Sequence, residues 1–238
     1  MTDPAPLGPR VPGWRPPPRP PRQALTGRYV TLEPLSAEAH AAELHRANSA
    51  DAAIWTYLPY GPYADETAFA AWMRGATAGE DPVFYAVRPA ATGRAEGVLS
   101  FLRIAPEAGS IEIGHVNFSA GLQRSRAATE ALTLAVGWAF EAGYRRVEWK
   151  CNALNLASRR AAQRLGLSYE GVFRQQSVVK GRNRDTAWFA AVDGEWPALK
   201  AAYRAWLDPA NFDAEGRQRV ALGALTAPVR AASDPMLG

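Results

Sequence analysis

The chain has 238 residues, and its 47% hydrophobic content with eight tryptophans is enough for the core of one large domain or two small ones. One cysteine, Cys151, excludes an intramolecular disulfide framework and a cysteine-cluster metal site, and no apolar run reaches the ~18 residues of a membrane span. The net charge is +4, but residues 1–22 carry +3 of it, which leaves too little for a nucleic-acid-binding surface elsewhere. We therefore expect a soluble, cytoplasmic protein with no metal and with no nucleic acid or membrane among its partners.

Nine of the nineteen prolines lie in residues 1–22, together with four arginines. Such a segment favours extended polyproline conformations and cannot bury enough apolar surface to fold alone. It also lacks the apolar core of a signal peptide. We predict that residues 1–23 form a disordered tail or lie along the surface of the folded part, with an SH3-like ligand as the alternative.

The folded part is predicted to begin with a strand at residues 28–33, where apolar residues alternate. Ser36 is placed to cap a helix over residues 38–47, and Asp65 to cap a second helix that ends at Ala78. Between the two helices lies a loop rich in aromatic residues.

The aromatic loop carries four large rings within nine residues, punctuated by proline and glycine: Trp55, Tyr57, Tyr60 and Tyr63. Such rings can pack in the core. They also suit the wall of a substrate pocket, because they are rigid and their polar tips can orient a ligand. Both interpretations stay open, and the four residues are candidate substrate-binding residues.

Three predicted strands, at residues 83–87, 97–104 and 111–118, lead to a polar turn at residues 123–128. The turn begins a helix whose buried face repeats through Phe140. The first N–H groups of a helix lack internal partners and carry the positive end of its dipole, so an anion such as a pyrophosphate suits this place. The alternative is an ordinary surface helix start with solvated arginines.

A second junction of the same kind follows a strand at residues 146–151. Asn155 is placed as the N-cap of a short helix, and Gly166 as its left-handed stop. A capping asparagine is common for purely structural reasons. Its position after a second strand, with Ser158, Arg159 and Arg160 on the first turn, extends the candidate anion site.

The last third of the chain is predicted to hold a hairpin, a closing helix and an extension. β-rich runs at residues 169–179 and 186–192 are joined by a polar connection, and a helix follows at 195–207. Residues 208–238 are expected to form a peripheral extension with one short helix around 217–222.

The order of these elements resembles the GCN5-related N-acetyltransferase (GNAT) fold, and the motifs resemble its RimJ/RimL-like subgroup of ribosomal-protein N-terminal acetyltransferases. The resemblance covers residues 24–207. It implies a single α/β (α+β) domain with a central mixed, mostly antiparallel twisted sheet of about seven strands, flanked by helices and splayed at the acyl-CoA site. The motifs are Gly-Val-Leu-Ser-Phe (97–101), Glu-Ile-Gly (112–114), Gln123-x-x-Arg126-x-Ala128, Asn155-x-x-Ser158 with Leu165-Gly166, and Val-Lys-Gly-x-x-Arg-Asp (179–185).

This resemblance implies an acyl-CoA-dependent N-acyltransferase that moves an acetyl group from acetyl-CoA to a primary amine. It also implies which residues hold the cofactor. The backbone of Asn117, Phe118 and Ser119 should pair with the pantetheine arm, and Asn155 and Ser158 should meet that arm near its reactive end. Arg159 is the candidate for the 3′-phosphate edge. The pyrophosphate turn comprises Gln123, Arg124, Ser125, Arg126, Ala127 and Ala128.

The sequence departs from the family motif at Arg126, which occupies the first glycine position. Glycine lets a backbone approach a pyrophosphate closely, so an arginine there re-aims some N–H contacts. Its charge can compensate, and we expect cofactor binding to survive.

Direct attack of an amine on a thioester needs a proton acceptor, donors for the oxyanion and a donor for the leaving thiolate. Glu112 is the candidate base, directly or through a water, and a strand carboxylate that balances an arginine is the alternative interpretation. Ser158 is the candidate donor to the thiolate. His115 does not share a face with Glu112 in a regular strand, but a β-bulge would bring it there, so it is a reserve candidate.

Three other possibilities stay open. Succinyl-CoA is an alternative donor, and a non-catalytic acyl-CoA sensor or an interaction protein that acts through its Pro-rich tail are alternative functions. The acceptor is a protein N-terminus or a small molecule, and a homodimer is a possible assembly.

Overall fold

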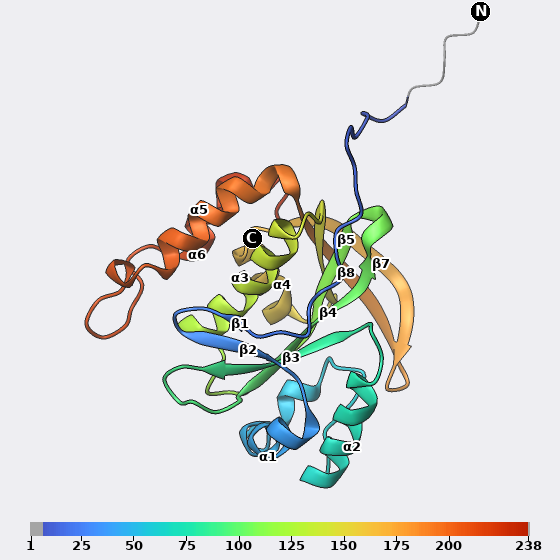
Figure 1. Ribbon diagram of the computed structural model, residues 1–238, viewed down its shortest axis with the longest axis vertical. Helices are drawn as coiled ribbons and strands as arrows, with labels where there is room; N and C mark the ends of the chain where they lie inside the picture. The colour runs from blue at the N-terminus through green and yellow to red at the C-terminus, as the bar shows by residue number, and fades with distance from the viewer. Residues whose placement is uncertain (1–6, 238) are drawn as a thin grey trace, which may run out of the picture.

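The computed structural model describes residues 7–237, and these form one mixed sheet with helices on both faces (Figure 1). The sheet order is β1-β2-β3-β4-β5-β6-β8-β7, and within the described residues only the β5–β6 pair is parallel. The predicted mixed, mostly antiparallel sheet is confirmed. The strands are β1 (Leu25–Thr26), β2 (Val30–Pro34), β3 (Val83–Pro89), β4 (Gly97–Ala105), β5 (Ser110–Phe118), β6 (Arg146–Asn152), β7 (Ser168–Val179) and β8 (Arg182–Val192).

The helices begin where the capping residues placed them. Ser36 accepts a hydrogen bond from Ala39 N at the start of α1, and Asp65 accepts one from Ala68 N at the start of α2. The helices are α1 (Ala37–Asn48), α2 (Glu66–Thr77), α3 (Arg126–Glu141), α4 (Leu156–Arg164), α5 (Trp196–Leu207) and α6 (Leu222–Thr226).

The short helix of the C-terminal extension lies later than predicted. It begins at Leu222, whereas residues 217–222 were expected to be helical. The Asp213 carboxylate accepts hydrogen bonds from the backbone N–H groups of Glu215 and Arg217, which fixes a turn there instead.

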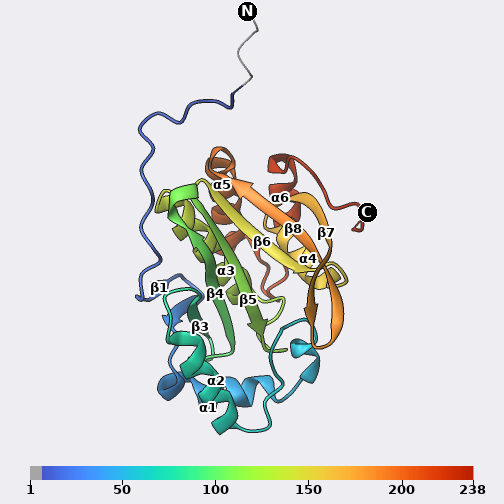
Figure 2. The same ribbon diagram turned by 90° about the vertical axis from the view of Figure 1, so that its right-hand side faces the viewer.

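Alternate residues of the strands point to opposite faces of the sheet and pack in two separate hydrophobic cores. Tyr85 and Val87 of β3 pack in the cluster that also holds α3 and α5, whereas Phe84 and Ala86 pack with α1 and α2. Helices α3, α4 and α5 therefore cover one face of the sheet, and α1 and α2 cover part of the other (Figures 1 and 2). The face of β5, β6 and β8 beyond α1 and α2 carries mostly polar side chains.

The sheet opens between β5 and β6. These strands pair only from Ser110 to Glu112, and then they diverge (Figure 2). Against β4, the strand β5 contains a bulge between Gly114 and Asn117, where His115 has a φ of 50°. The predicted splay is confirmed, and past Glu112 one edge of β5 has no strand partner in the described residues.

The hairpin of β7 and β8 is tighter than predicted. Only Lys180 and Gly181 form the turn, with φ values of 49° and 72°, so the polar connection at 180–185 does not exist as a loop. Two residues with positive φ suit the right-handed twist of a hairpin, and β8 can therefore begin at Arg182. This moves Arg184 onto a strand.

The N-terminal segment lies along the domain from Trp14 to Arg22. Trp14, Pro17 and Pro20 are at least partly buried at a spacing of three, the repeat of a polyproline helix. Tyr144 Oη donates to the Pro18 carbonyl at 3.1 Å, and Tyr85 Oη donates to the Pro21 carbonyl. Residues 1–6 of the predicted tail lie outside the described residues.

Two global properties hold for the described part of the chain. No helix in residues 7–237 is long and apolar enough to cross a membrane. Within the same residues, no group of three or more histidine, cysteine, aspartate or glutamate side chains is arranged to hold a metal ion.

Candidate active site

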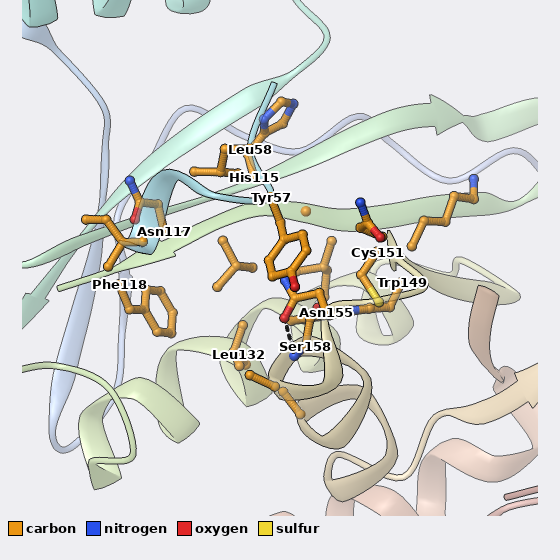
Figure 3. Close-up of a pocket in the computed structure, with 18 of the residues that line it drawn as sticks. Tyr57, Leu58, His115, Asn117, Phe118, Leu132, Trp149, Cys151, Asn155 and Ser158 are labelled. Atoms are coloured by element: carbon orange, nitrogen blue, oxygen red, sulfur yellow. Dashed lines mark hydrogen bonds between the residues drawn. The ribbon is translucent and has the colours of Figure 1, made fainter. Parts of the chain in front are cut away.

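A cavity of about 790 Å³ occupies the opening between β5 and β6. Its walls come from β4, β5, β6, the N-terminal half of α3, helix α4, the segment 51–59 and Arg184 of β8. It passes from the α3 and α4 face of the sheet to the polar face that carries Glu112. Figure 3 shows Tyr57 pointing across it toward Asn155 and Ser158, with Asn117 and Phe118 at the other end.

The turn before α3 presents unpaired backbone donors. Arg124 adopts a left-handed conformation with a φ of 58°, and Ser125 caps the helix by accepting from Ala128 N at 3.0 Å. Within the described residues, the N–H groups of Arg124, Arg126 and Ala127 donate to no protein atom. Successive free N–H groups at a helix start form an anion-binding nest.

Arg126 does not contribute its charge to this nest. Its guanidinium lies 4.3 Å from the ring centre of Phe212 and 5.3 Å from that of Tyr29, and it does not line the cavity. The residue is the first of α3 and has no positive φ, so the position does not demand glycine. The cations at this end of the cavity are Arg124, Arg160 and Arg164.

Asn155 and Ser158 shape the second junction. Asn155 Oδ1 accepts from Ser158 N at 3.1 Å, and Trp149 Nε1 donates to Ser158 Oγ at 2.9 Å (Figure 3). Ser158 Oγ accepts the indole hydrogen and keeps its own hydroxyl proton, for which Cys151 is one hydrogen-bond partner. The neighbouring Cys151 lines the cavity as a thiol, since burial raises its pKa to about 11.

Arg159 is not available for a 3′-phosphate, contrary to the sequence-based expectation. Its guanidinium is buried and pairs with both carboxylate oxygens of Asp234 at 2.5 Å, and it also donates to the Ala153 carbonyl at 2.7 Å. All the donors are directed into the protein. Arg160, the next residue, lines the cavity instead.

The remaining cofactor candidates divide into two groups. Ser119 is turned away, because its N–H donates to the Glu96 carbonyl at 3.0 Å and its Oγ accepts from Leu122 N. Gln123 supports the turn by donating Nε2 to the Phe118 carbonyl at 2.9 Å. Seven of the candidates line the cavity: Asn117, Phe118, Gln123, Arg124, Ala128, Asn155 and Ser158.

The aromatic loop is divided between the wall of the cavity and the second core. Tyr57 lines the cavity, and its hydroxyl donates to the Leu154 carbonyl at 3.2 Å. Trp55 and Tyr63 do not line it; they pack with Phe69 in the second core. Tyr60 lies between the two groups, with its hydroxyl 3.0 Å from His115 Nδ1.

Glu112 lines the cavity from the polar face and is itself buried. Its Oε2 lies 2.8 Å from Arg103 Nη1 and 2.9 Å from Lys150 Nζ. Lys150 also contacts Glu148 at 2.7 Å. A Cβ on Gly114 would come within 3.3 Å of Glu112 Oε1 and 2.9 Å of Leu102, so the motif glycine leaves room for the carboxylate.

His115 shares the face of Glu112 because of the bulge. Ile113 and Val116 pack in the core of α3, so the bulge leaves Glu112 and His115 together on the opposite side. Burial lowers the pKa of His115 to about 4, and the charges of Arg103 and Arg184 act in the same direction. The imidazole is therefore neutral at pH 7.

Comparison with known proteins identifies the family of this chain. The family model described as "Acetyltransferase (GNAT) domain" matches residues 30–168. The chain belongs to the GNAT acetyltransferase family. A GCN5-related N-acetyltransferase from Brucella melitensis is 46% identical, with a TM-score of 0.89 over 91% of this chain and 100% of that one. A GNAT-family acetyltransferase from Chromobacterium violaceum ATCC 12472 is 45% identical, with a TM-score of 0.78 over 83% of this chain and 100% of that one.

More distant GNAT structures share the fold alone. The microcin C7 self-immunity acetyltransferase MccE, solved with acetyl-CoA and AMP, is 19% identical, with a TM-score of 0.62 over 70% of this chain and 93% of that one. RimL, a ribosomal L7/L12 α-N-protein acetyltransferase, is 20% identical, with a TM-score of 0.61 over 71% of this chain and 93% of that one. No curated protein sequence matches this chain.

Several charged residues that line the cavity were not predicted from the sequence. Arg184 was predicted to lie in a loop, and Lys150 was predicted to lie in a strand with no role in the site. The alternating polar residues of β6 were the only sequence feature that indicated a polar face here. The residues missed in this way are Arg103, Lys150, Arg164 and Arg184.

Proposed function

We propose that this GNAT protein is an acyl-CoA-dependent N-acyltransferase that transfers an acetyl group from acetyl-CoA to a primary amine. One observation carries the proposal: a single cavity extends from the turn before α3, where Arg124 has a free N–H group, to the polar groups of Glu112 and Ser158. A pyrophosphate suits the first end, because backbone donors and arginines converge there. A thioester suits the region between β5 and β6.

The proposed reaction is direct attack of the neutral amine nitrogen on the thioester carbonyl carbon. Glu112 accepts the proton that the amine loses, directly or through a water. The unpaired edge of β5 offers N–H groups to the oxyanion of the tetrahedral intermediate. When the carbon–sulfur bond breaks, Ser158 Oγ donates a proton to the thiolate, so the products are the amide and CoA thiol.

His115 is the alternative proton acceptor. Its neutral ring lies on the same face as Glu112, and Tyr60 holds it in place. Burial lowers the pKa of His115 and makes it a weaker base than an ordinary imidazole, so it is second to Glu112 in this proposal.

The finer assignments stay predictions. The hairpin motif at residues 179–185 supports the RimJ/RimL-like subgroup, and Asn117, with a buried Oδ1 that has no hydrogen-bond partner, is proposed to receive the pantetheine arm. A cytoplasmic location and a homodimer are part of the same proposal.

Release of free CoA thiol from acetyl-CoA tests the function. We expect release that depends on an added primary amine, with slower background hydrolysis. Succinyl-CoA in a parallel reaction identifies the acyl group, and acetyl-CoA should be used faster. Tight binding of acetyl-CoA without amine-dependent release across a broad amine panel would instead identify an acyl-CoA sensor.

A further inference from the structure

Arg184 is a charged side chain in the cavity that forms no ion pair with a carboxylate of residues 7–237. It lines the cavity from β8, and its Nε is buried without a hydrogen-bond partner. Among residues 7–237 no carboxylate lies within ion-pair distance of its guanidinium. Burial also lowers the pKa of Arg184, and the charge of Arg103 acts in the same direction.

The other cations on this side of the cavity already have partners. Arg103 pairs with Glu112, and Lys150 pairs with both Glu112 and Glu148. Asp185, next to Arg184 in sequence, points into the hairpin, where its carboxylate accepts from Gln175 N at 2.7 Å. Arg184 is therefore the cation at this end that lacks a counter-charge.

The position of Arg184 separates it from the pyrophosphate end. The cations at that end belong to the turn before α3 and to α4. Lys150 of β6 pairs with Trp188 of β8, and side chains alternate along a strand, so Arg184 projects from the same face as Lys150. That is the face of Glu112, where the amine arrives in the proposed reaction.

We infer that Arg184 binds a carboxylate of the amine acceptor, so that the acceptor is an amino acid or a similar small amine with a carboxylate near its amino group. A guanidinium fork matches a carboxylate, and such a pair would satisfy donors that otherwise stay buried and unpaired. This inference rests on the proposed function. A protein N-terminus, whose first carboxyl group is in amide linkage, lacks the recognised group.

Acylation of the standard amino acids, each compared with its own α-amide, tests the inference with acetyl-CoA as donor. The variants are Arg184→Gln and, as a matched control, Arg182→Gln, which removes the same charge from an exposed position of the hairpin outside the cavity. The expected result is at least one amino acid whose kcat/KM exceeds that of its amide by about 10- to 100-fold in the wild type. Arg184→Gln should abolish that preference, whereas Arg182→Gln should keep it.

Three results would overturn the inference. The first is equal use of acids and amides by the wild type, and the second is a preference that survives in Arg184→Gln. The third is a defect of Arg184→Gln that appears with succinyl-CoA and every acceptor but not with acetyl-CoA, which would place the carboxylate on the acyl group.

If the protein does not transfer acyl groups, the experiments give a different set of results. In that case acetyl-CoA binds, but no amine in the panel is acylated. The role of Arg184 is then decided by calorimetric titration of the amino acids and amides into acetyl-CoA-loaded protein. A preference for acids that Arg184→Gln removes would sustain the inference, and equal binding would overturn it.

Discussion

Glu112 is the residue on which the proposed chemistry depends most. It contacts the cavity, yet its Oε2 is shared by Arg103 and Lys150. Glu112→Gln keeps the shape of the side chain and removes its ability to accept a proton. We expect turnover to fall about 100-fold, with the acetyl-CoA dissociation constant within about twofold of wild type, because the cofactor is held at the other end.

A pH–rate profile decides whether that loss reflects proton transfer. If Glu112 is the base, the pH–rate profile of the mutant should differ in shape from that of the wild type, with its acidic limb lost. An unchanged profile would remove Glu112 from the role and leave His115→Gln as the next variant to examine.

The side chain of Arg126 is expected to contribute little to cofactor affinity. Because its guanidinium stacks on Phe212 and Tyr29 outside the cavity, Arg126→Gly should leave the acetyl-CoA dissociation constant within about threefold. The loss of the stacking should lower the free energy of unfolding by about 1 kcal/mol. Arg124→Gly is the control, since Arg124 lines the cavity and its positive φ suits glycine. Calorimetry should show weaker binding in the control and not in Arg126→Gly; the reverse order would place the Arg126 side chain in the site.

His115 gives the fold a specific pH dependence. Its folded-state pKa of about 4 lies below the ordinary value of 6.5. Between these values the unfolded chain binds a proton that the folded chain does not, so stability is greatest above pH 6.5 and decreases as the pH falls toward 4. The contribution is at most about 3 kcal/mol. Urea unfolding at several pH values should show a shallower dependence for His115→Gln, and an identical slope would mean that His115 is solvated.

Local chemistry explains which site residues the sequence could indicate. Asn155 and Ser158 are linked by a capping bond between residues three apart, and such bonds can be predicted from neighbours. Arg159 and Arg160 are equivalent in that local pattern. Which of them faces the cavity is decided by Asp234, 75 residues from Arg159, and no local signal contains that information.

At the scale of elements, the bulge in β5 decides which groups meet. A regular strand would place His115 on the face opposite to Glu112, and the bulge brings them together. The alternation of apolar and polar residues predicted the strand. A bulge was considered only as the condition under which His115 would share a face with Glu112. The two-residue hairpin turn was missed for a related reason, because the polar residues 182–185 are typical of a loop and their strand pairing depends on β7.

The polyproline segment is an element whose contacts lie within its own chain. Trp14, Pro17 and Pro20 face the domain, and Tyr85 and Tyr144 donate to the carbonyls beside them. Deletion of residues 1–22 should lower the free energy of unfolding by about 2 kcal/mol or more, because the covered apolar surface becomes exposed. Acetyl-CoA binding should persist. Thermal unfolding and calorimetry measure both quantities, and an unchanged unfolding temperature would show that the segment does not stabilise the domain.

At the scale of the whole molecule, one buried ion pair attaches the C-terminal extension to α4. Asp234→Ala leaves the Arg159 charge buried without its partner, which should cost about 3–5 kcal/mol. Burial acts to raise the pKa of Asp234, but the Arg159 guanidinium outweighs it and holds the pKa below 3.8. The pair therefore stabilises the fold above that pH, and its contribution is lost as the pH falls below it.

Denaturant unfolding of Asp234→Ala and Asp234→Asn at pH 7 measures this contribution. Asp234→Asn retains hydrogen-bond acceptance and should be the milder change. Equal stability of Asp234→Ala and wild type would mean that the other contacts of the extension hold it without this ion pair.

The central claim is that the opening between β5 and β6 holds acetyl-CoA in one defined orientation. A crystal structure of the acetyl-CoA complex tests it most directly. The pyrophosphate should accept from the N–H groups of Arg124, Arg126 and Ala127, with the thioester between Ser158 and Glu112. A pyrophosphate bound away from this turn, or a thioester remote from Glu112, would contradict the account.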